Sequence, residues 1–235
     1  MVEHGADDKI SPKLYPLPTI YQIYLTLYKA FGPQHWWPAE SPFEVIMGAI
    51  LTQNTAWVNV EKALANLKEA KIFDPQSLYQ TDLETLSRLI RPAGYFNQKA
   101  RKINNFLHFL FSAYEGELSR MWQESLESLR EKLLKVPGIG EETADSILLY
   151  AGSKPIFVID TYTMRLVKRH QLLKEKDNYG ELQRLFMKNL PRNTEIYNEY
   201  HALLVHLGKE FCGKRKPLCQ QCPLRGYLNN VKEDL

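Results

Sequence analysis

The sequence predicts an all-α protein, and three observations support this class. The 235 residues lack the sustained alternation of apolar and polar side chains that half-buried strands show. Apolar residues instead recur at spacings of three and four, which places them on one face of a helix. Glycine and proline interrupt this periodicity at 32–38, 91–94, 137–140 and 152–155. Helices joined by short turns are therefore the expected architecture.

The expected helices follow from this periodicity in chain order. Residues 1–18 carry no such pattern. Helices are expected at 20–31, 43–51, 57–70, 75–79, 83–90, 97–114, 126–134, 141–151, 161–170, 178–189 and 193–208. The first is rich in Tyr and Leu, and the second is apolar, with Gly48 and Ala49 allowing close contact. Three expected helices have the clearest apolar faces. These faces are formed by Val60, Leu64 and Leu67 in 57–70, by Ile103, Phe106, Leu107 and Leu110 in 97–114, and by Ala144, Ile147, Leu148 and Ala151 in 141–151.

Composition and charge exclude several classes of protein. Hydrophobic residues make up 44% and charged residues 24%, as in ordinary folded domains. No apolar run has the length of a membrane span, and the first residues lack the layout of a signal peptide, so a cytoplasmic protein (nucleoid-associated in a prokaryote) is expected. The net charge of +3 is too small to indicate a nucleic-acid partner, although basic residues cluster at 99–102 and 214–216.

The segment 133–140 reads as a turn between two helices, because Pro137, Gly138 and Gly140 break the helical pattern. Glycine allows the backbone to approach another group closely. The N–H groups that open the helix after Gly140 have no partner within the helix and attract phosphate. A phosphate site and an ordinary turn both fit these residues.

Asp160 follows a short apolar run at 156–159 and precedes a new helical pattern. A partly desolvated carboxylate at this point suits chemistry on a nucleic-acid backbone, but Asp is also a common helix N-cap. The two uses are compatible, since a capping carboxylate leaves one oxygen free.

Two tryptophans, Trp36 and Trp37, lie in a loop between Pro33 and Pro38. They are either a plug on the core or an aromatic wall for a flipped base, where stacking contributes about 1–3 kcal/mol per base.

The three cysteines, Cys212, Cys219 and Cys222, fall within eleven positions of the C-terminal part. This spacing argues against a disulfide framework and favours metal ligation or a remnant of it.

These segments together resemble the endonuclease III superfamily of DNA glycosylases. The sequences LLKVPGIGEETA at 133–144 and VIDT at 158–161 resemble its helix-hairpin-helix motif and catalytic aspartate. LTQNT at 51–55 resembles the segment that the family inserts into the duplex, and the cysteines resemble three of the four in its iron–sulfur loop. The similarity runs from about 36 to 228.

The resemblance implies two helical lobes with double-stranded DNA in the cleft between them. One is a six-helix barrel at 38–150 with its hairpin at 134–141. The other combines 19–37 with 151–235 and carries the cysteine loop at 212–228. A monomer without a membrane partner is expected.

It also implies a role for each candidate residue. Asp160 would stabilise the positive charge that develops on the sugar when the base leaves, a reaction that needs no cofactor. The DNA-binding candidates are Gln53 and Asn54, which would fill the gap left by the base, and Gly138, Ile139, Gly140 and Thr143 at the hairpin. The carbonyls of Lys135, Val136 and Ile139 would hold a monovalent cation.

Two departures from the family pattern change the expected activity. Glu142 stands where the bifunctional members have the lysine that forms a Schiff base, so a glycosylase that leaves an abasic site is expected. Leu228 stands where the fourth cysteine would be. An iron–sulfur cluster on three thiolates and a zinc site completed by His201 or His206 both remain open.

The substrate is expected to be an alkylated purine. Trp36, Trp37 and Pro38, with Trp57 and the segment 91–100, resemble the 3-methyladenine glycosylase branch. An aromatic slot between Trp37 and Trp57 would favour the cationic base, and Lys209 would border this pocket. Three alternatives remain open. In the first, the tryptophans are core packing and the substrate is an oxidised pyrimidine or a mismatched base. In the second the enzyme is a bifunctional glycosylase and lyase, and in the third the protein is a non-catalytic binder of damaged DNA.

Overall fold

The computed structural model describes residues 19–37, 39–172 and 178–227. Over these residues the chain forms helices and loops with no strand, which confirms the predicted all-α class. Pro38, an expected pocket residue, and Leu228 lie outside the described residues. Within the described ranges, no helix combines the length and apolar character needed to cross a bilayer.

The helices agree with the predicted ranges to within a few residues. They are α1 (Ile20–Phe31), α2 (Pro42–Leu51), α3 (Trp57–Glu69), α4 (Pro75–Gln80), α5 (Leu83–Leu89), α6 (Phe96–Tyr114), α7 (Leu118–Met121), α8 (Leu126–Leu134), α9 (Glu141–Ser146), α10 (Thr161–Arg169), α11 (Tyr179–Asn189) and α12 (Thr194–Glu210). Short 3-10 turns are η1 (Arg91–Ala93), η3 (Cys219–Gln221) and η4 (Arg225–Tyr227). The one-turn α7 was not predicted. The expected helix at 141–151 becomes a π-helix, η2 (Ile147–Ala151), in its second half.

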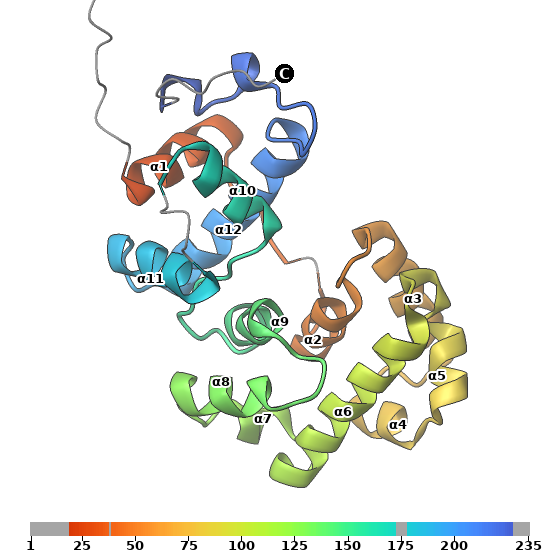
Figure 1. The fold of residues 1–235 in the computed structure, drawn as a ribbon. Helices are drawn as coiled ribbons and strands as arrows, with labels where there is room; N and C mark the ends of the chain where they lie inside the picture. Colours follow the sequence, from red (N-terminus) through yellow and green to blue (C-terminus); the bar gives the residue numbers. More distant parts are fainter. Residues whose placement is uncertain (1–18, 38, 173–177, 228–235) are drawn as a thin grey trace, which may run out of the picture.

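The helices fall into two groups that meet at α9 and η2 (Figure 1). In one group α1 packs on α11 and α12, and α10 packs on α12. In the other, α6 packs on α4, α5 and α7, and α2 packs on α3. Helix α9 contacts α2 and α8, while η2 contacts both α2 and α12. The expected boundaries of the two lobes, 38–150 for one and 19–37 with 151–235 for the other, stay a prediction.

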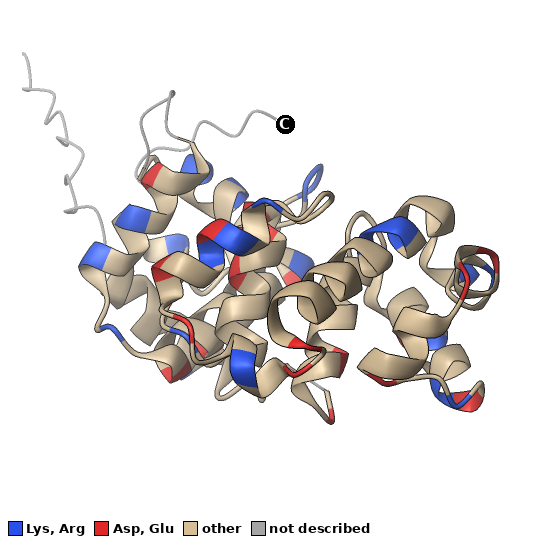
Figure 2. Ribbon diagram, turned by 90° about the horizontal axis from the view of Figure 1, so that it is seen from below, with Lys and Arg blue, Asp and Glu red and all other residues tan. Residues whose placement is uncertain are grey.

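Charged residues of both signs are spread over the two groups of helices (Figure 2). This distribution agrees with the small net charge of +3. Long-range attraction of DNA by a single-sign surface is therefore a weak effect here.

Local sequence signals explain where the helices begin. Thr19 caps α1 in a capping box, in which its hydroxyl accepts from the Gln22 N–H and the Gln22 side chain accepts from the Thr19 N–H. Ser41 caps α2, with Pro42 at its first position. Asp82 caps α5 by accepting from the Thr85 N–H at 2.8 Å.

The most heavily bonded group in the described core is the carboxylate of Asp145, which is fully buried in α9. Arg130 of α8 donates to it from Nε at 2.7 Å and from Nη2 at 3.1 Å. From α11, the Tyr179 hydroxyl donates to Oδ2 at 2.8 Å and the Gln183 amide at 2.6 Å. Burial and the nearby Asp145 charge raise the pKa of Tyr179, so its hydroxyl keeps the proton that it donates.

The same two α11 side chains hold the segment that leads to Asp160. The Gln183 amide also donates to the Phe157 carbonyl at 2.7 Å. The Tyr179 hydroxyl accepts from the Ile159 N–H at 3.3 Å. Asp145 thus connects α8, α9 and α11 to the backbone immediately before Asp160.

Replacing Asp145 with Asn should lower the free energy of unfolding by about 3 kcal/mol, because it removes the fully buried charge that Arg130, Tyr179 and Gln183 bond. Arg130 then keeps only the carboxylate of Glu141, at 3.7 Å. Urea unfolding followed by circular dichroism measures this change. The control is Glu131→Gln, which breaks an ion pair with Lys135 whose two side chains are each 71% exposed. That control should cost less than about 1 kcal/mol. Equal losses in the two variants would contradict a special role for Asp145.

Candidate active site

Asp160 is the N-cap of α10, and its carboxylate divides two tasks between its oxygens. Oδ1 accepts from the Thr163 N–H at 2.7 Å and from the Thr163 hydroxyl at 2.8 Å. Oδ2 lies 3.6 Å from His201 Nε2. The buried backbone from Ile156 to Ile159 delivers the residue to this position, where it is 8% exposed. The capping and the chemical interpretations of Asp160 are therefore compatible.

The same surroundings set the charge of this carboxyl group. Burial raises the pKa of Asp160, but His201 and the Thr163 donors lower it by more, so the pKa lies below the ordinary value. Asp160 is consequently a carboxylate at neutral pH, as stabilisation of a sugar cation requires.

Glu142 stands at the exposed start of α9. Desolvation by the surrounding protein and, to a lesser extent, the negative charge of Asp160 raise its pKa. The position where a Schiff-base lysine is expected therefore holds a carboxyl group and no amine.

The hairpin before α9 has the geometry of a tight turn. Gly138 has φ +95°, and a Cβ at this position would lie 2.4 Å from Cγ of Lys102. Ile139 is buried, and its N–H donates to the Val136 carbonyl at 3.0 Å. The Ile139 N–H is therefore bonded within the turn, and its expected contact with a phosphate stays a prediction. Gly138 and Gly140 are exposed.

The Val136 carbonyl, one of three expected cation ligands, is the acceptor of that turn bond. The monovalent cation stays a prediction.

The two residues expected to enter the duplex differ in their surroundings. The Gln53 amide donates to the Thr143 hydroxyl at 3.0 Å and to the Gly138 carbonyl at 3.4 Å, and its oxygen accepts from Lys102. Gln53 and Thr143 are thus held together against the hairpin. Asn54 is exposed, with a left-handed backbone at φ +55°.

Lys99 was expected in a basic cluster on the surface, but its side chain is buried. Its ammonium donates to the Leu51 carbonyl at 2.8 Å and to the Ala93 carbonyl at 2.7 Å. These bonds fix the end of α2, where the loop that carries Gln53 and Asn54 begins. Burial, and to a lesser extent Lys102, lowers the pKa of Lys99 to about 8.

The tryptophans form one cluster at the meeting point of the two groups of helices. The ring centroids of Trp36 and Trp37 are 5.4 Å apart, and those of Trp37 and Tyr150 are 5.2 Å apart. A Cβ on Gly48 of α2 would lie 3.2 Å from the Trp57 ring and 3.3 Å from the Trp37 ring. Gly48 therefore allows these rings to pack directly on the helix backbone.

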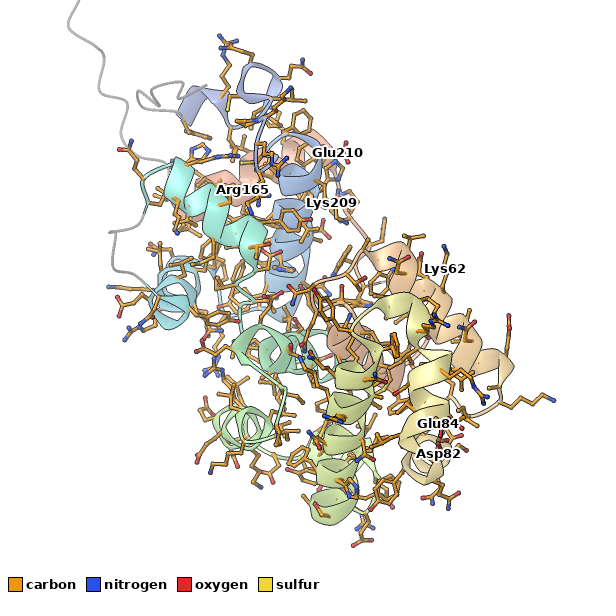
Figure 3. The ribbon with its side chains drawn as sticks, turned by 45° about the vertical axis from the view of Figure 1, so that its right-hand side comes forward. Lys62, Asp82, Glu84, Arg165, Lys209 and Glu210 are labelled. Atoms are coloured by element: carbon orange, nitrogen blue, oxygen red, sulfur yellow. The ribbon has the colours of Figure 1, made fainter. Side chains whose placement is uncertain are left out.

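The expected slot between Trp37 and Trp57 is not formed. The two rings meet edge to face, at 5.2 Å and an interplanar angle of 86°, so no parallel gap for a base lies between them. The ammonium of Lys209 lies 5.9 Å from the Trp36 ring centroid. It projects from the end of α12, near Arg165 of α10 and far from Asp82 (Figure 3). Lys209 and the tryptophans therefore belong to one region.

Two site residues were not found from the sequence. The Tyr150 hydroxyl lies 2.5 Å from Nδ1 of His201. The Tyr150 ring packs against Trp37, and His201 lies next to Asp160. The sequence suggests His201 only as a zinc ligand and gives no signal for Tyr150. His206 bonds to Gln34 at 2.8 Å. The proposed zinc roles of His201 and His206 therefore do not fit.

The cysteine loop is braced by two arginines of α10. Arg169 donates to Cys212 Sγ at 3.0 Å and to the Lys214 carbonyl at 3.2 Å. Arg165 donates to the Cys212 carbonyl at 2.7 Å and to the Gly208 carbonyl at 3.2 Å.

Over the described part of the chain, no three Cys, His, Asp or Glu side chains converge to hold a metal ion. Cys212, Cys219 and Cys222 are partly buried thiols, and burial raises the pKa of Cys222. The arrangement does not fit the expected ligand set.

Comparison with known proteins agrees with this geometry. A Methanocaldococcus jannaschii protein provisionally named a DNA repair glycosylase is 45% identical over 88% of this chain and 94% of its own length. Endonuclease III of Thermotoga maritima is 31% identical over 88% of this chain and 91% of its own.

Two solved structures have the same fold. The Helicobacter pylori 3-methyladenine DNA glycosylase MagIII, bound to 1,N6-ethenoadenine, superposes with a TM-score of 0.73 and 29% identity over 82% of this chain and 98% of its own. A non-covalent endonuclease III–DNA complex superposes with a TM-score of 0.78 and 27% sequence identity. The match covers 91% of this chain and 96% of that one.

These similarities identify the class of protein as a DNA glycosylase. The family model for HhH-GPD superfamily base excision DNA repair proteins matches residues 47–192, and the chain belongs to this superfamily. The predicted relation to endonuclease III is thereby confirmed.

The buried ammonium of Lys99 predicts a stability that rises at alkaline pH. Its pKa is about 8 in the folded chain and 10.5 ordinarily, so the unfolded chain binds more protons between these values. From pH 8 to 10.5, the free energy of unfolding should rise by up to about 3 kcal/mol relative to Lys99→Met. Urea unfolding of both proteins across this range measures the difference. Lys62→Met, at an exposed position of α3, is the control and should follow the natural sequence. Parallel curves for the natural sequence and Lys99→Met would contradict the prediction.

Proposed function

We propose that the chain is a monofunctional DNA glycosylase that hydrolyses the N-glycosidic bond of a flipped, alkylated purine in duplex DNA and leaves an abasic site. The observation that carries this proposal is the Asp160 carboxylate, which keeps Oδ2 free of its capping bonds. Glu142 stands where the Schiff-base lysine of a bifunctional enzyme is expected. The similarity to MagIII, a 3-methyladenine glycosylase solved with an ethenoadenine, supports the substrate class.

The chemistry follows from the charge of Asp160. As the bond between C1′ and the base nitrogen breaks, the electron pair leaves with the base and positive charge develops on the sugar. The carboxylate stabilises this charge electrostatically, and water adds to C1′ and loses a proton. Alkylation at N3 or N7 makes the purine cationic, so it leaves as a neutral molecule without strong acid assistance.

The absence of lyase activity rests on the amines around the hairpin. A Schiff base requires a free amine at C1′. Glu142 cannot form one. Lys102 donates to Gln53, Lys99 is bonded to two carbonyls inside the core, and Lys135 pairs with Glu131 at 2.7 Å. Each of these amines has a partner in the structure.

DNA would be held by the exposed parts of the hairpin and of the loop after α2. The N–H groups of Gly138 and Gly140 would face a phosphate at the start of α9. Asn54 would enter the duplex, because Gln53 is tied to Thr143 and Lys102. The flipped base would contact Trp36, which lies beside Lys209.

The position of Lys209 favours a second candidate substrate. A protonated lysine at 5.9 Å from the Trp36 ring centroid repels a cationic base at the same ring. A neutral damaged base would not meet this repulsion. Release of ethenoadenine in preference to 3-methyladenine would favour this second candidate.

The test is release of free bases from methylated duplex DNA, separated by chromatography. The natural sequence should release 3-methyladenine, and Asp160→Asn should lower the rate about 100- to 1,000-fold, because Asn caps the helix but carries no charge. Asp82→Asn is the matched control, since Asp82 caps α5 through the same bond to a threonine N–H three residues on. It should keep full activity.

Borohydride reduction during the reaction checks the predicted absence of lyase activity. No covalent adduct between protein and DNA should form, because Glu142 stands where the lysine that makes the imine is expected. A trapped adduct would show a bifunctional enzyme. Equal base release by Asp160→Asn and the natural sequence would show that Asp160 is only a cap.

A further inference from the structure

A chain of three side chains from three different elements ends at the catalytic carboxylate. Tyr150 belongs to η2, His201 to α12, and Asp160 stands at the start of α10. The Tyr150 hydroxyl is 2.5 Å from Nδ1 of His201, and Nε2 of His201 is 3.6 Å from Oδ2 of Asp160. Neither of these two contacts is local in sequence.

Two features of the fold bring these elements together. The π-helical turn η2 widens the helix after Ser146, with the Gly152 N–H bonded to the Ile147 carbonyl at 3.0 Å, and Tyr150 lies in this turn. Such turns are frequent at functional sites. Helix α10 approaches α12 so closely that a Cβ on Gly208 would lie 2.2 Å from Cδ1 of Tyr162. Only glycine permits this approach.

The contacts of His201 decide which nitrogen carries the proton. A neutral imidazole has one donor and one acceptor nitrogen. If Nε2 were the acceptor, its lone pair would face the Asp160 carboxylate. With the proton on Nε2, the donor faces the carboxylate and Nδ1 accepts from the Tyr150 hydroxyl. A doubly protonated His201 also presents an Nε2–H to Asp160.

Tyr150 is suited to donate to Nδ1. Burial, and then the charges of Asp160 and Glu142, raise the pKa of Tyr150 well above its ordinary value. Its hydroxyl therefore keeps its proton throughout the physiological range.

The Nε2 atom of His201 is buried and has no hydrogen-bond partner among the described residues. At 3.6 Å from Oδ2 it is slightly beyond bonding distance. A small rotation of the Asp160 carboxylate would close the bond. An unpaired buried donor aimed at the carboxylate is costly unless it interacts with that group.

We propose that His201 is a positioning residue for the glycosylase reaction, whose Nε2–H fixes Oδ2 of Asp160 and keeps the carboxylate charged, while Tyr150 holds the imidazole in the tautomer that presents this N–H. This inference rests on the proposed function. Neither side chain contacts the reacting sugar, and both act through Asp160.

The electrostatic balance explains why such a residue is needed. The titratable groups that face this pair within the described chain are Glu142 from α9 and Tyr150 from η2. Burial raises the pKa of Asp160, whereas His201 lowers it. Without the imidazole, the buried carboxylate would be protonated more readily and would lose the charge that the reaction requires.

Two amide substitutions separate the roles of the imidazole nitrogens. In His201→Gln, the side-chain amide nitrogen reaches the place of Nε2, so the donor to Asp160 is kept. In His201→Asn, the shorter amide reaches only the place of Nδ1, so that donor is lost. Single-turnover base release, measured from pH 3 to 9, gives the rate and its acid limb, which is the fall in rate at low pH as Asp160 becomes protonated.

His201→Asn should lower the rate about 10- to 100-fold, with little change in KM, because the carboxylate is misplaced while DNA contacts remain. The acid limb should move to higher pH by about one pH unit, because the Asp160 pKa rises when its donor is removed. His201→Gln should stay close to the natural sequence. Tyr150→Phe should shift the acid limb in the same direction but less.

His170→Asn is the matched control. His170 is a buried histidine at the end of α10 whose Nδ1 is also unpaired among the described residues. This change should affect stability without moving the acid limb. The proposal is overturned if His201→Asn and His201→Gln have the same rate and acid limb, or if His170→Asn moves the acid limb as far as His201→Asn does.

A second measurement separates this inference from the proposed function. Nitrogen-15 NMR of the imidazoles, with His201 assigned by its loss in His201→Gln, reports the protonated nitrogen without any substrate. The Nε2–H form at neutral pH, with a resonance that shifts in Asp160→Asn, is expected. An Nδ1–H form would overturn the inference even if the enzyme releases bases. If no damaged base is released from any duplex while the Nε2–H signal is present, the proposed function fails and the positioning of Asp160 stands.

Discussion

The buried carboxylate of Asp145 is the constraint on which the rest of the structure depends. A charge in a core is tolerated only when it is paired and its hydrogen bonds are satisfied. Arg130, Tyr179 and Gln183 supply the four bonds, and they come from helices on both sides of α9. Because Tyr179 and Gln183 also hold the backbone at Phe157 and Ile159, the same charge fixes the approach to Asp160.

Asp160 in turn combines a structural and a chemical task in one side chain. Its Oδ1 is saturated by Thr163 and anchors the start of α10. In the proposed reaction its Oδ2 would face the sugar, in surroundings where burial alone would favour the neutral acid. The carboxylate keeps its charge because donors from α10 and α12 surround it. In the proposed reaction, the positive charge on the sugar would meet a carboxylate that is already oriented and ionised, which is how preorganised electrostatic stabilisation lowers a barrier.

The surface that would meet DNA is organised from within the protein. Lys99 lies under the loop after α2 and fixes its beginning, and Lys102 and Thr143 hold Gln53 against the hairpin. Asn54 projects from a loop that is otherwise tied down. The cysteine loop has a comparable internal support, since Arg165 and Arg169 of α10 bond to its backbone and to Cys212. Charged side chains that looked like surface groups thus act as internal braces.

The sequence by itself determined the helices, the hairpin turn and the cap at Asp160. These depend on apolar spacing, on glycine and proline, and on bonds between residues three or four apart. Only the tertiary structure decided the burial of Lys99, the edge-to-face packing of Trp37 on Trp57, and the alignment of Tyr150, His201 and Asp160. Each of these joins segments that are distant in the chain. Their side chains acquire an environment only when helices pack, and periodicity does not encode which helices meet.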